Sequence, residues 1–369
     1  MKTRALATAL LLATATACAR KVIPPTSLFP LGQAWRTPVA SGVDGALAAD
    51  ADRVYFVSGG AVHALRLADG APAWTAENRA GVLTAAADLL VVREPSGTVW
   101  ALDPRTGSAR WKVASQVPGT LPAVVDRDRV LVAGDGIAVL EASSGRAVFT
   151  AAGEPKVTAP PTVSGGLLVT GEADGSVRAR DAATGALRWT YATGGGAPQA
   201  AALDDAGKRL FVGTSARGFV ALDAEKGSRD WRWKVGADVP AAATFAGSLV
   251  LFASNEAVLY GMHRGGNLSW RAPLPSRPRS IPMVFGTSVL VACHGLRPSE
   301  SLLVGFDART GRRLGDLKTP AELKTAPVAS SRVLVAALRD GTVIGWRLPA
   351  EEVPEKPVPT GPSPNSPKP

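Results

Sequence analysis

Short apolar runs separated by turn residues follow one another along most of the chain. The runs Val333–Ala337 and Thr342–Trp346, for example, flank the turn residues Asp340 and Gly341. Val- and Leu-rich runs of this length around Asp-Gly predict a β-hairpin. Another short run, often opened by Pro as at Pro327, precedes each pair. Helical periodicity is nearly absent, so the pattern predicts an all-β protein.

A tract that recurs at a nearly constant spacing follows the hairpins. Segment Ala101–Trp111 reads Ala-Leu-Asp-Pro-Arg-Thr-Gly-Ser-Ala-Arg-Trp, and Ala179–Trp189 has Ala, Asp, Thr, Gly and Trp at the same offsets. Asp, Thr and Gly are typical of a turn, and a Trp after it offers a large apolar face to a neighbouring sheet. The aromatic positions are spaced by 37 to 42 residues, and Gly315 stands where the next is due: Trp35, Trp74, Trp111, Phe149, Trp189, Trp231 and Trp270.

Four short strands in about forty residues, repeated many times, predict a β-propeller. Eight third strands can be counted, marked by Val62, Val99, Ile137, Val177, Phe219, Val258, Leu303 and Val343. The eighth repeat lacks a fourth strand, which the segment Gly32–Trp35 would supply, so that no sheet edge is left open. We therefore predict an eight-bladed β-propeller of four-stranded antiparallel blades over residues 32–348, closed by the N-terminal strand; a seven-bladed ring is the alternative.

The first residues have the pattern of a secretory signal peptide. Lys2 and Arg4 precede an apolar run that is too short to span a bilayer as a mature helix. The stretch Ala15-Thr16-Ala17-Cys18 then resembles the lipobox of bacterial lipoproteins. This resemblance implies cleavage after residue 17, acylation of Cys18 and a lipidated tether over residues 18–31. Ala19 in place of Asp favours the outer membrane, with the protein facing the periplasm.

Composition changes this picture little. Lys and Arg exceed Asp and Glu by 41 to 31. Such a surplus attracts anionic partners without identifying one. We predict no nucleic-acid partner. The only cysteines are Cys18 and Cys293, and the three histidines are scattered, so we predict neither a disulfide framework nor a metal site. The Pro-rich residues 349–369 are expected to form a disordered tail.

The pattern Ala-x-Asp-x-x-Thr-Gly-x-x-x-Trp of Ala101–Trp111 and Ala179–Trp189 resembles the tryptophan-docking repeat of PQQ-like propellers. Within that superfamily, the lipobox, the single propeller and the strand with Trp35 resemble the BamB family of outer-membrane assembly lipoproteins. This resemblance implies a non-enzymatic scaffold that contacts envelope proteins, among them the β-barrel assembly machinery, through loops on one side of the ring. The Leu-Arg-Gly and Asp-x-Asp stretches common in that family are absent from residues 154–160 and 235–240. No binding residues therefore carry over.

Two other functions stay open. One is a lipoprotein that binds a carbohydrate or another anionic envelope polymer through its basic surface. The other is a PQQ-dependent dehydrogenase, which needs a calcium-held cofactor and a catalytic carboxylate. The resemblance implies that such enzymes are longer and often carry adjacent cysteines, so we predict no cofactor and no catalytic residues here.

The seventh repeat departs most from the others. It lacks its Trp and has a longer hairpin, in which Arg297 and Glu300 are candidate partner-binding residues because loops on a rigid scaffold often carry function. Cys293 is expected to be a small buried residue, with His294 on the opposite face of the strand.

Overall fold

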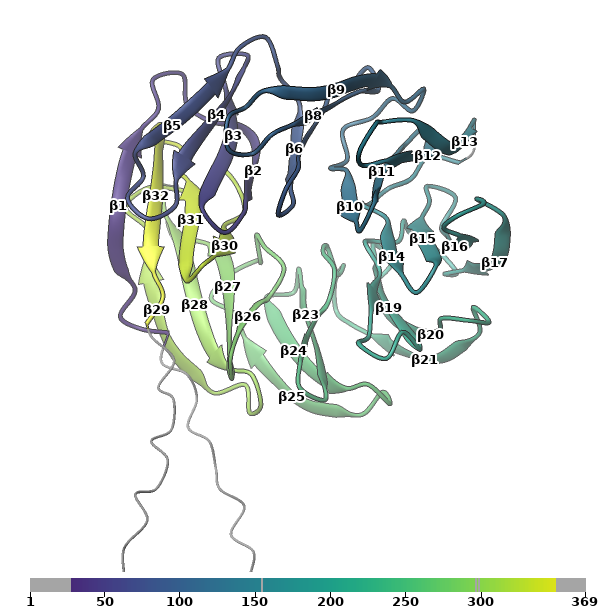
Figure 1. The fold of residues 1–369 in the computed structure, drawn as a ribbon. Helices are drawn as coiled ribbons and strands as arrows, with labels where there is room; N and C mark the ends of the chain where they lie inside the picture. The colour runs from purple at the N-terminus through teal and green to yellow at the C-terminus, as the bar shows by residue number, and fades with distance from the viewer. Residues whose placement is uncertain (1–27, 154, 296, 298, 350–369) are drawn as a thin grey trace, which may run out of the picture.

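The computed structural model describes residues 28–153, 155–295, 297 and 299–349. These residues form eight four-stranded antiparallel sheets and no helix. The sheets stand as blades around a ring (Figure 1). The predicted eight-bladed β-propeller is therefore confirmed, and the seven-bladed alternative is wrong.

Blades 1 to 7 are each built from four consecutive strands, with the first innermost and the fourth at the rim. The strands of blades 1 to 4 are β2 (Asp44–Ala49), β3 (Arg53–Ser58), β4 (Ala61–Arg66), β5 (Pro72–Ala76), β6 (Val82–Ala85), β7 (Leu90–Arg93), β8 (Thr98–Leu102), β9 (Ala109–Ala114), β10 (Val124–Asp126), β11 (Arg129–Gly134), β12 (Gly136–Glu141), β13 (Ala147–Ala152), β14 (Thr162–Ser164), β15 (Leu167–Gly171), β16 (Ser176–Asp181) and β17 (Leu187–Ala192).

The remaining strands complete the ring. They are β18 (Ala202–Leu203), β19 (Arg209–Thr214), β20 (Gly218–Asp223), β21 (Arg229–Lys234), β22 (Thr244–Ala246), β23 (Leu249–Ser254), β24 (Val258–His263), β25 (Leu268–Pro273), β26 (Met283–Phe285), β27 (Ser288–His294), β28 (Ser301–Asp307), β29 (Arg313–Lys318), β30 (Val328–Ser330), β31 (Val333–Ala337) and β32 (Thr342–Arg347). The prolines expected to open inner strands lie just before them, as Pro327 does before β30. The four inner strands that follow these prolines, β10, β14, β26 and β30, have three residues each.

The core is divided among the junctions between blades. Eight apolar clusters are present, and each joins the strands of two neighbouring blades. The middle strands contact a sheet on both sides, so β7 is buried at all four residues, whereas the rim strand β9 alternates between exposed and half-buried positions. This explains why the middle strands read as continuous apolar runs.

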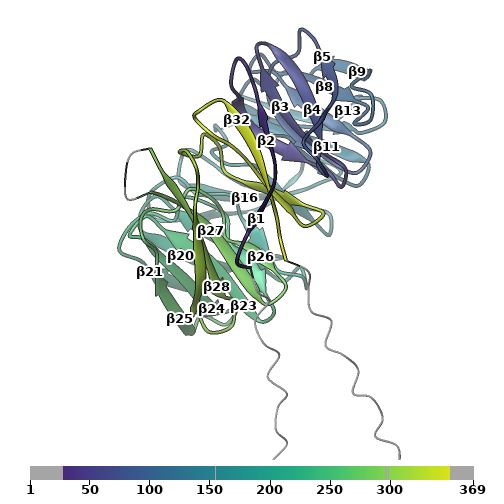
Figure 2. The ribbon, with the colours of Figure 1, turned by 90° about the vertical axis from the view of Figure 1, so that its left-hand side faces the viewer.

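The N-terminal strand closes the ring, as predicted. β1 (Gly32–Pro38) pairs antiparallel with β32, with Gly32 opposite Arg347 and Trp35 opposite Gly345 (Figure 2). A further hydrogen bond runs from Val39 N to Gly341 O, at 2.8 Å. Blade 8 is thus β1 together with β30, β31 and β32, and the closing strand is longer than the segment Gly32–Trp35 that the sequence indicated.

The up-and-down course of the strands creates two faces with different loops. The turns between first and second strands and between third and fourth strands lie on one side, which we call the turn face. The hairpins between second and third strands and the interblade loops lie on the other, which we call the loop face. Because β1 enters at Gly32 opposite Arg347, both described chain ends lie on the turn face.

Candidate functional site

Six repeated Trp residues each connect one blade to the next. The indole Nε1 of Trp74 donates to Pro104 O at 3.0 Å, and that of Trp111 donates to Ala142 O at 2.8 Å, in both cases across a blade junction. The other four make the equivalent bond, from Trp35 to Leu67, Trp189 to Ala224, Trp231 to Arg264 and Trp270 to Ala308. The acceptor is always a carbonyl at the start of the next turn on the turn face.

The Gly of each repeated turn leaves room for the Trp ring of the preceding blade. Gly107 has φ +73°, and a Cβ placed on it would lie 2.6 Å from the Trp74 ring, so both conformation and space require Gly. Asp181 holds the same turn in blade 4 by accepting bonds from Ala183 N and Thr184 N, each at 3.0 Å. Arg188 beside it and these amides lower the pKa of Asp181 to about 2. The carboxylate of this recurring Asp therefore serves to stabilise the turn.

Phe149 occupies the Trp position of blade 3. A Cβ on Gly185 would lie 2.7 Å from its ring, so Phe149 packs on the next blade as the Trp residues do. The Phe149 side chain has no N–H, however, so it cannot donate to the carbonyl of the neighbouring turn. The junction of blades 3 and 4 keeps the packing and loses the hydrogen bond.

Blade 7 receives its aromatic ring from the N-terminal segment. Gly315 lies opposite Gly305 in the β28–β29 pair, and Cβ atoms on Gly305 and Gly315 would lie 2.5 and 2.9 Å from the Phe29 ring. Phe29 therefore covers the place that a Trp covers elsewhere. The sequence pattern does not reveal this replacement, because Phe29 stands before the repeats begin.

Moving the aromatic side chain from position 29 to position 315 tests this replacement. We expect Phe29→Ala to lower the free energy of unfolding by about 2 to 4 kcal/mol, because a half-buried aromatic ring leaves a gap over two glycines. Gly315→Trp alone should also destabilise, because the two rings need the same space. The double variant Phe29→Ala/Gly315→Trp should be more stable than either single variant in urea unfolding. Simple addition of the two losses would contradict the shared site.

Buried polar side chains order the loop face. Ser115 Oγ donates to Gly97 O at 2.7 Å, Thr193 Oγ1 to Gly175 O at 2.8 Å and Thr319 Oγ1 to Ser301 O at 3.1 Å. Each residue directly follows a fourth strand and holds the hairpin of its own blade. In blade 4 the fully buried Glu172 also pairs with Arg178. Hydrogen bonds of this kind hold the loops in one conformation.

Arg93 is the largest of these buried polar side chains. It ends β7, is fully buried, and donates to Leu121 O, Ala133 O and Val117 O at 2.7, 2.6 and 3.0 Å. Burial lowers the pKa of its guanidinium to about 10. Arg93 thereby fastens the loop between blades 2 and 3 to both blades. Sequence reasoning missed it, because an Arg at the end of an apolar run reads as exposed.

A charged cluster ties together the loops of blades 7 and 8. Glu322 accepts from Arg279 Nη1 and from Arg339 Nε, both at 2.8 Å. Arg279 also lies 3.3 Å from His294 Nδ1. Desolvation of the ring and the charge of Arg279 lower the pKa of His294, which favours the neutral imidazole. Only the tertiary structure brings these four residues together.

The candidate partner loop lies next to this cluster. Arg297 is 78% exposed, whereas Glu300 is 16% exposed and accepts from Lys318 Nζ at 2.7 Å. The Arg297 and Glu300 charges are 4.0 Å apart, so Arg297 presents its charge to solvent. Cys293 is fully buried on β27, and burial raises the pKa of its thiol to about 12. His294 faces the opposite side and is exposed, as the alternation of a strand requires.

The described residues lack two kinds of feature. Among them no three His, Cys, Asp or Glu side chains gather as ligands of a metal ion would. The same part of the chain contains no helix with the length and apolar character needed to cross a bilayer. Cys18 and the predicted tail beyond Pro349 lie outside the described residues.

Comparisons with known proteins agree with this architecture. The BamB of Burkholderia pseudomallei strain K96243 is 26% identical, in a match that covers 71% of this chain and 83% of that protein. The crystal structure of BamB from Moraxella catarrhalis superposes with a TM-score of 0.68 at 22% identity and covers 86% of this chain and 98% of that one. The quinohemoprotein alcohol dehydrogenase of Comamonas testosteroni shares the fold, with a TM-score of 0.65, 14% identity and coverage of 87% and 78%.

The family assignment rests on the sequence. The profile of the family described as outer membrane protein assembly factor BamB matches residues 32–120, 95–235 and 200–345. These three overlapping matches run from β1 into β32 and so span almost the whole ring. The chain therefore belongs to the family of the outer membrane protein assembly factor BamB.

Proposed function

We propose that the protein is a lipid-anchored, non-enzymatic scaffold in the assembly of outer-membrane β-barrel proteins. The family match over residues 32–345 carries the proposal. The lipobox ending at Cys18 supplies the anchor, which would hold the propeller at the periplasmic side of the outer membrane. The partner would be the β-barrel assembly machinery of the envelope.

The loop face is the surface best suited to such a partner. It lies opposite both described chain ends, and buried side chains such as Arg93 and Thr193 hold its loops in place. A surface that is ordered in advance loses less conformational entropy on binding. Arg277 is exposed there, and Arg297 is 78% exposed with its ion pair to Glu300 at 4.0 Å, so both can meet an acidic partner surface.

Affinity capture of the intact lipoprotein from its own membranes tests the proposal. We expect recovery of barrel-assembly components with the wild-type chain, and several-fold less with Arg277→Glu/Arg297→Glu. Lys226→Glu, which changes an exposed residue of the turn face, is the matched control and should capture as the wild type does. Cys18→Ser should leave the membrane fraction if the anchor is correct.

The same experiment distinguishes the alternative function. Recovery of no barrel-assembly component, together with salt-sensitive binding to an anionic envelope polymer, would replace the scaffold with a polymer-binding lipoprotein. The 41 basic against 31 acidic residues favour this second candidate.

A further inference from the structure

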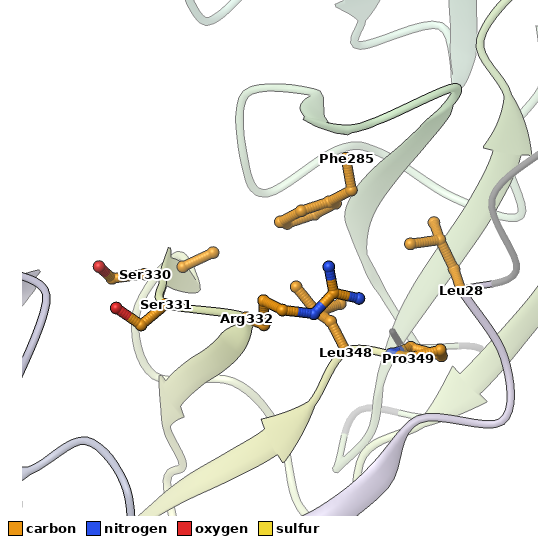
Figure 3. A pocket seen from close by; sticks show the side chains of 8 residues that line it. Leu28, Phe285, Ser330, Ser331, Arg332, Leu348 and Pro349 are labelled. Carbon is orange, nitrogen blue, oxygen red and sulfur yellow. The ribbon is translucent and has the colours of Figure 1, made fainter. Parts of the chain in front are cut away.

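Both described ends of the chain lie at one pocket of the turn face. Leu28 and Pro349 line a cavity of about 300 Å³ together with Phe285, Leu348 and Arg332 (Figure 3). The cavity lies between blades 7 and 8, beside the strand pair that closes the ring. Whatever is attached to the N-terminal segment therefore leaves the propeller from this sector.

The distance from the predicted anchor to this sector is short. Leu28 is ten residues after Cys18, and ten extended residues reach at most about 35 Å. An acylated Cys18 would thus keep the turn face of blades 7 and 8 close to the lipid head groups.

Four exposed arginines lie on the turn face in these two blades. They are Arg309 and Arg312 in the β28–β29 turn, Arg332 in the β30–β31 turn, and Arg347 at the end of β32. Among the described residues, none of the four makes an ion pair within 4.0 Å.

The neighbouring carboxylates are already engaged. Asp307 accepts from Arg309 N and Thr310 N, both at 2.9 Å, and Asp316 pairs with Arg313 at 2.8 Å. Asp52, which lines the adjoining pocket with Arg332 and Arg347, is 80% exposed and lies 3.9 Å from Arg53, so it offsets at most one of the arginine charges. The four guanidinium groups therefore give this sector a local surplus of positive charge.

The turn that presents Arg332 is strained. Ser331 and Arg332 have φ values of +43° and +64°, whereas the equivalent turn of blade 4 has Gly165 and Gly166 in that region. Ser331 Oγ donates to Ala51 O of blade 1 at 2.7 Å, and Arg332 O accepts from Leu348 N at 2.8 Å. Strain that is held in place by such bonds is a reason to look for function. The backbone that carries Arg332 is thereby held at the mouth of the pocket.

We propose that Arg309, Arg312, Arg332 and Arg347 form a contact surface for anionic lipid head groups. This inference rests on the proposed anchor at Cys18, since the tether brings the surface and the bilayer together. Basic side chains near an anionic bilayer bind it additively and within a Debye length. The contact orients the ring with its turn face toward the membrane and its loop face toward the periplasm.

Vesicle binding by the mature chain without its lipid tests the contact. Residues 18–369 with Cys18→Ser, which lack both the signal peptide and the acylation site, are mixed with vesicles of equal parts phosphatidylglycerol and phosphatidylcholine, or of phosphatidylcholine alone, and sedimented. We expect binding to the anionic vesicles only, with loss at high salt. Changing the four arginines to Gln should weaken this binding about tenfold or more.

A second set of four arginines serves as the control. Arg217, Arg232, Arg277 and Arg297 are exposed toward the loop face, and their change to Gln alters the net charge equally. This variant should keep most of the binding. An equal loss in both sets, or binding to neutral vesicles, overturns the proposal, and circular dichroism checks that both variants are folded.

The chain's own acidic residues are the competing occupant. Glu351 and Glu352 follow Pro349 after a single residue, Ala350. If only the variant Glu351→Gln/Glu352→Gln binds anionic vesicles, the arginines serve the tail rather than the lipid, which also overturns the proposal. None of these results depends on the capture of barrel-assembly components, so the two proposals fail separately.

Discussion

Trp35→Ala is expected to lower the free energy of unfolding by about 4 kcal/mol, which is at the upper part of the range for truncating a buried aromatic residue. Trp35 is 6% exposed, and its Nε1 donates to Leu67 O at 2.8 Å in the next blade. It also belongs to β1, the strand that joins the two ends of the chain. One substitution therefore weakens both a blade junction and the ring closure. Urea unfolding followed by tryptophan fluorescence and circular dichroism measures the change.

Trp270→Ala is the matched control for the effect of closure. Trp270 is 8% exposed and makes the same interblade bond, to Ala308 O at 3.1 Å, but lies within a blade of consecutive strands. Its loss should be smaller, because only one junction is weakened and the ring stays closed. If Trp270→Ala is as damaging as Trp35→Ala, closure by β1 adds nothing beyond ordinary packing.

Arg93→Met is expected to cost about 3 kcal/mol or more. The long apolar side chain keeps much of the packing, but three buried carbonyl groups lose their donor, and each unsatisfied group carries a penalty of about 1 to 3 kcal/mol. These are the carbonyls of Val117, Leu121 and Ala133, two of them in the loop between blades 2 and 3. Urea unfolding measures the loss. Limited proteolysis should in addition show faster cleavage in residues 115–123.

Two variants make the Arg93 result specific. Arg217→Met changes an exposed arginine of the loop face and should alter stability by no more than about 0.5 kcal/mol. Arg93→Lys keeps the charge but offers donors at one point only, so it should recover part of the loss. Unchanged protease sensitivity of Arg93→Met would show that the loop is held by other contacts.

The loop face and the turn face divide the proposed functions between them. Interblade loops that are fastened by Arg93, Thr193 and Glu322 offer a fixed surface to a protein partner. The sector that holds both chain ends is suited instead to the membrane. A ring anchored in this way would present its loop face to the protein partner and its turn face to the membrane.

Much of this fold could be predicted from the sequence because its determinants are local. A turn that begins with Asp103 and ends with Gly107 needs those residue types for its own backbone, wherever the blade lies. A Trp at a fixed offset then contacts the next such turn. The rhythm of these tracts gave the number of blades, and the missing fourth strand of the last repeat indicated closure by the segment with Trp35.

The tertiary structure alone decided the contacts that depend on the closed ring. Phe29 covers Gly305 and Gly315 only because β1 pairs with β32, and no local pattern marks an aromatic residue so far away in sequence. The acceptors of Arg93 lie 24, 28 and 40 residues further along the chain. Repeated turns follow from short-range chemistry, whereas a ring filled by its own N-terminal segment and loops fastened across blades exist only once all eight sheets have met.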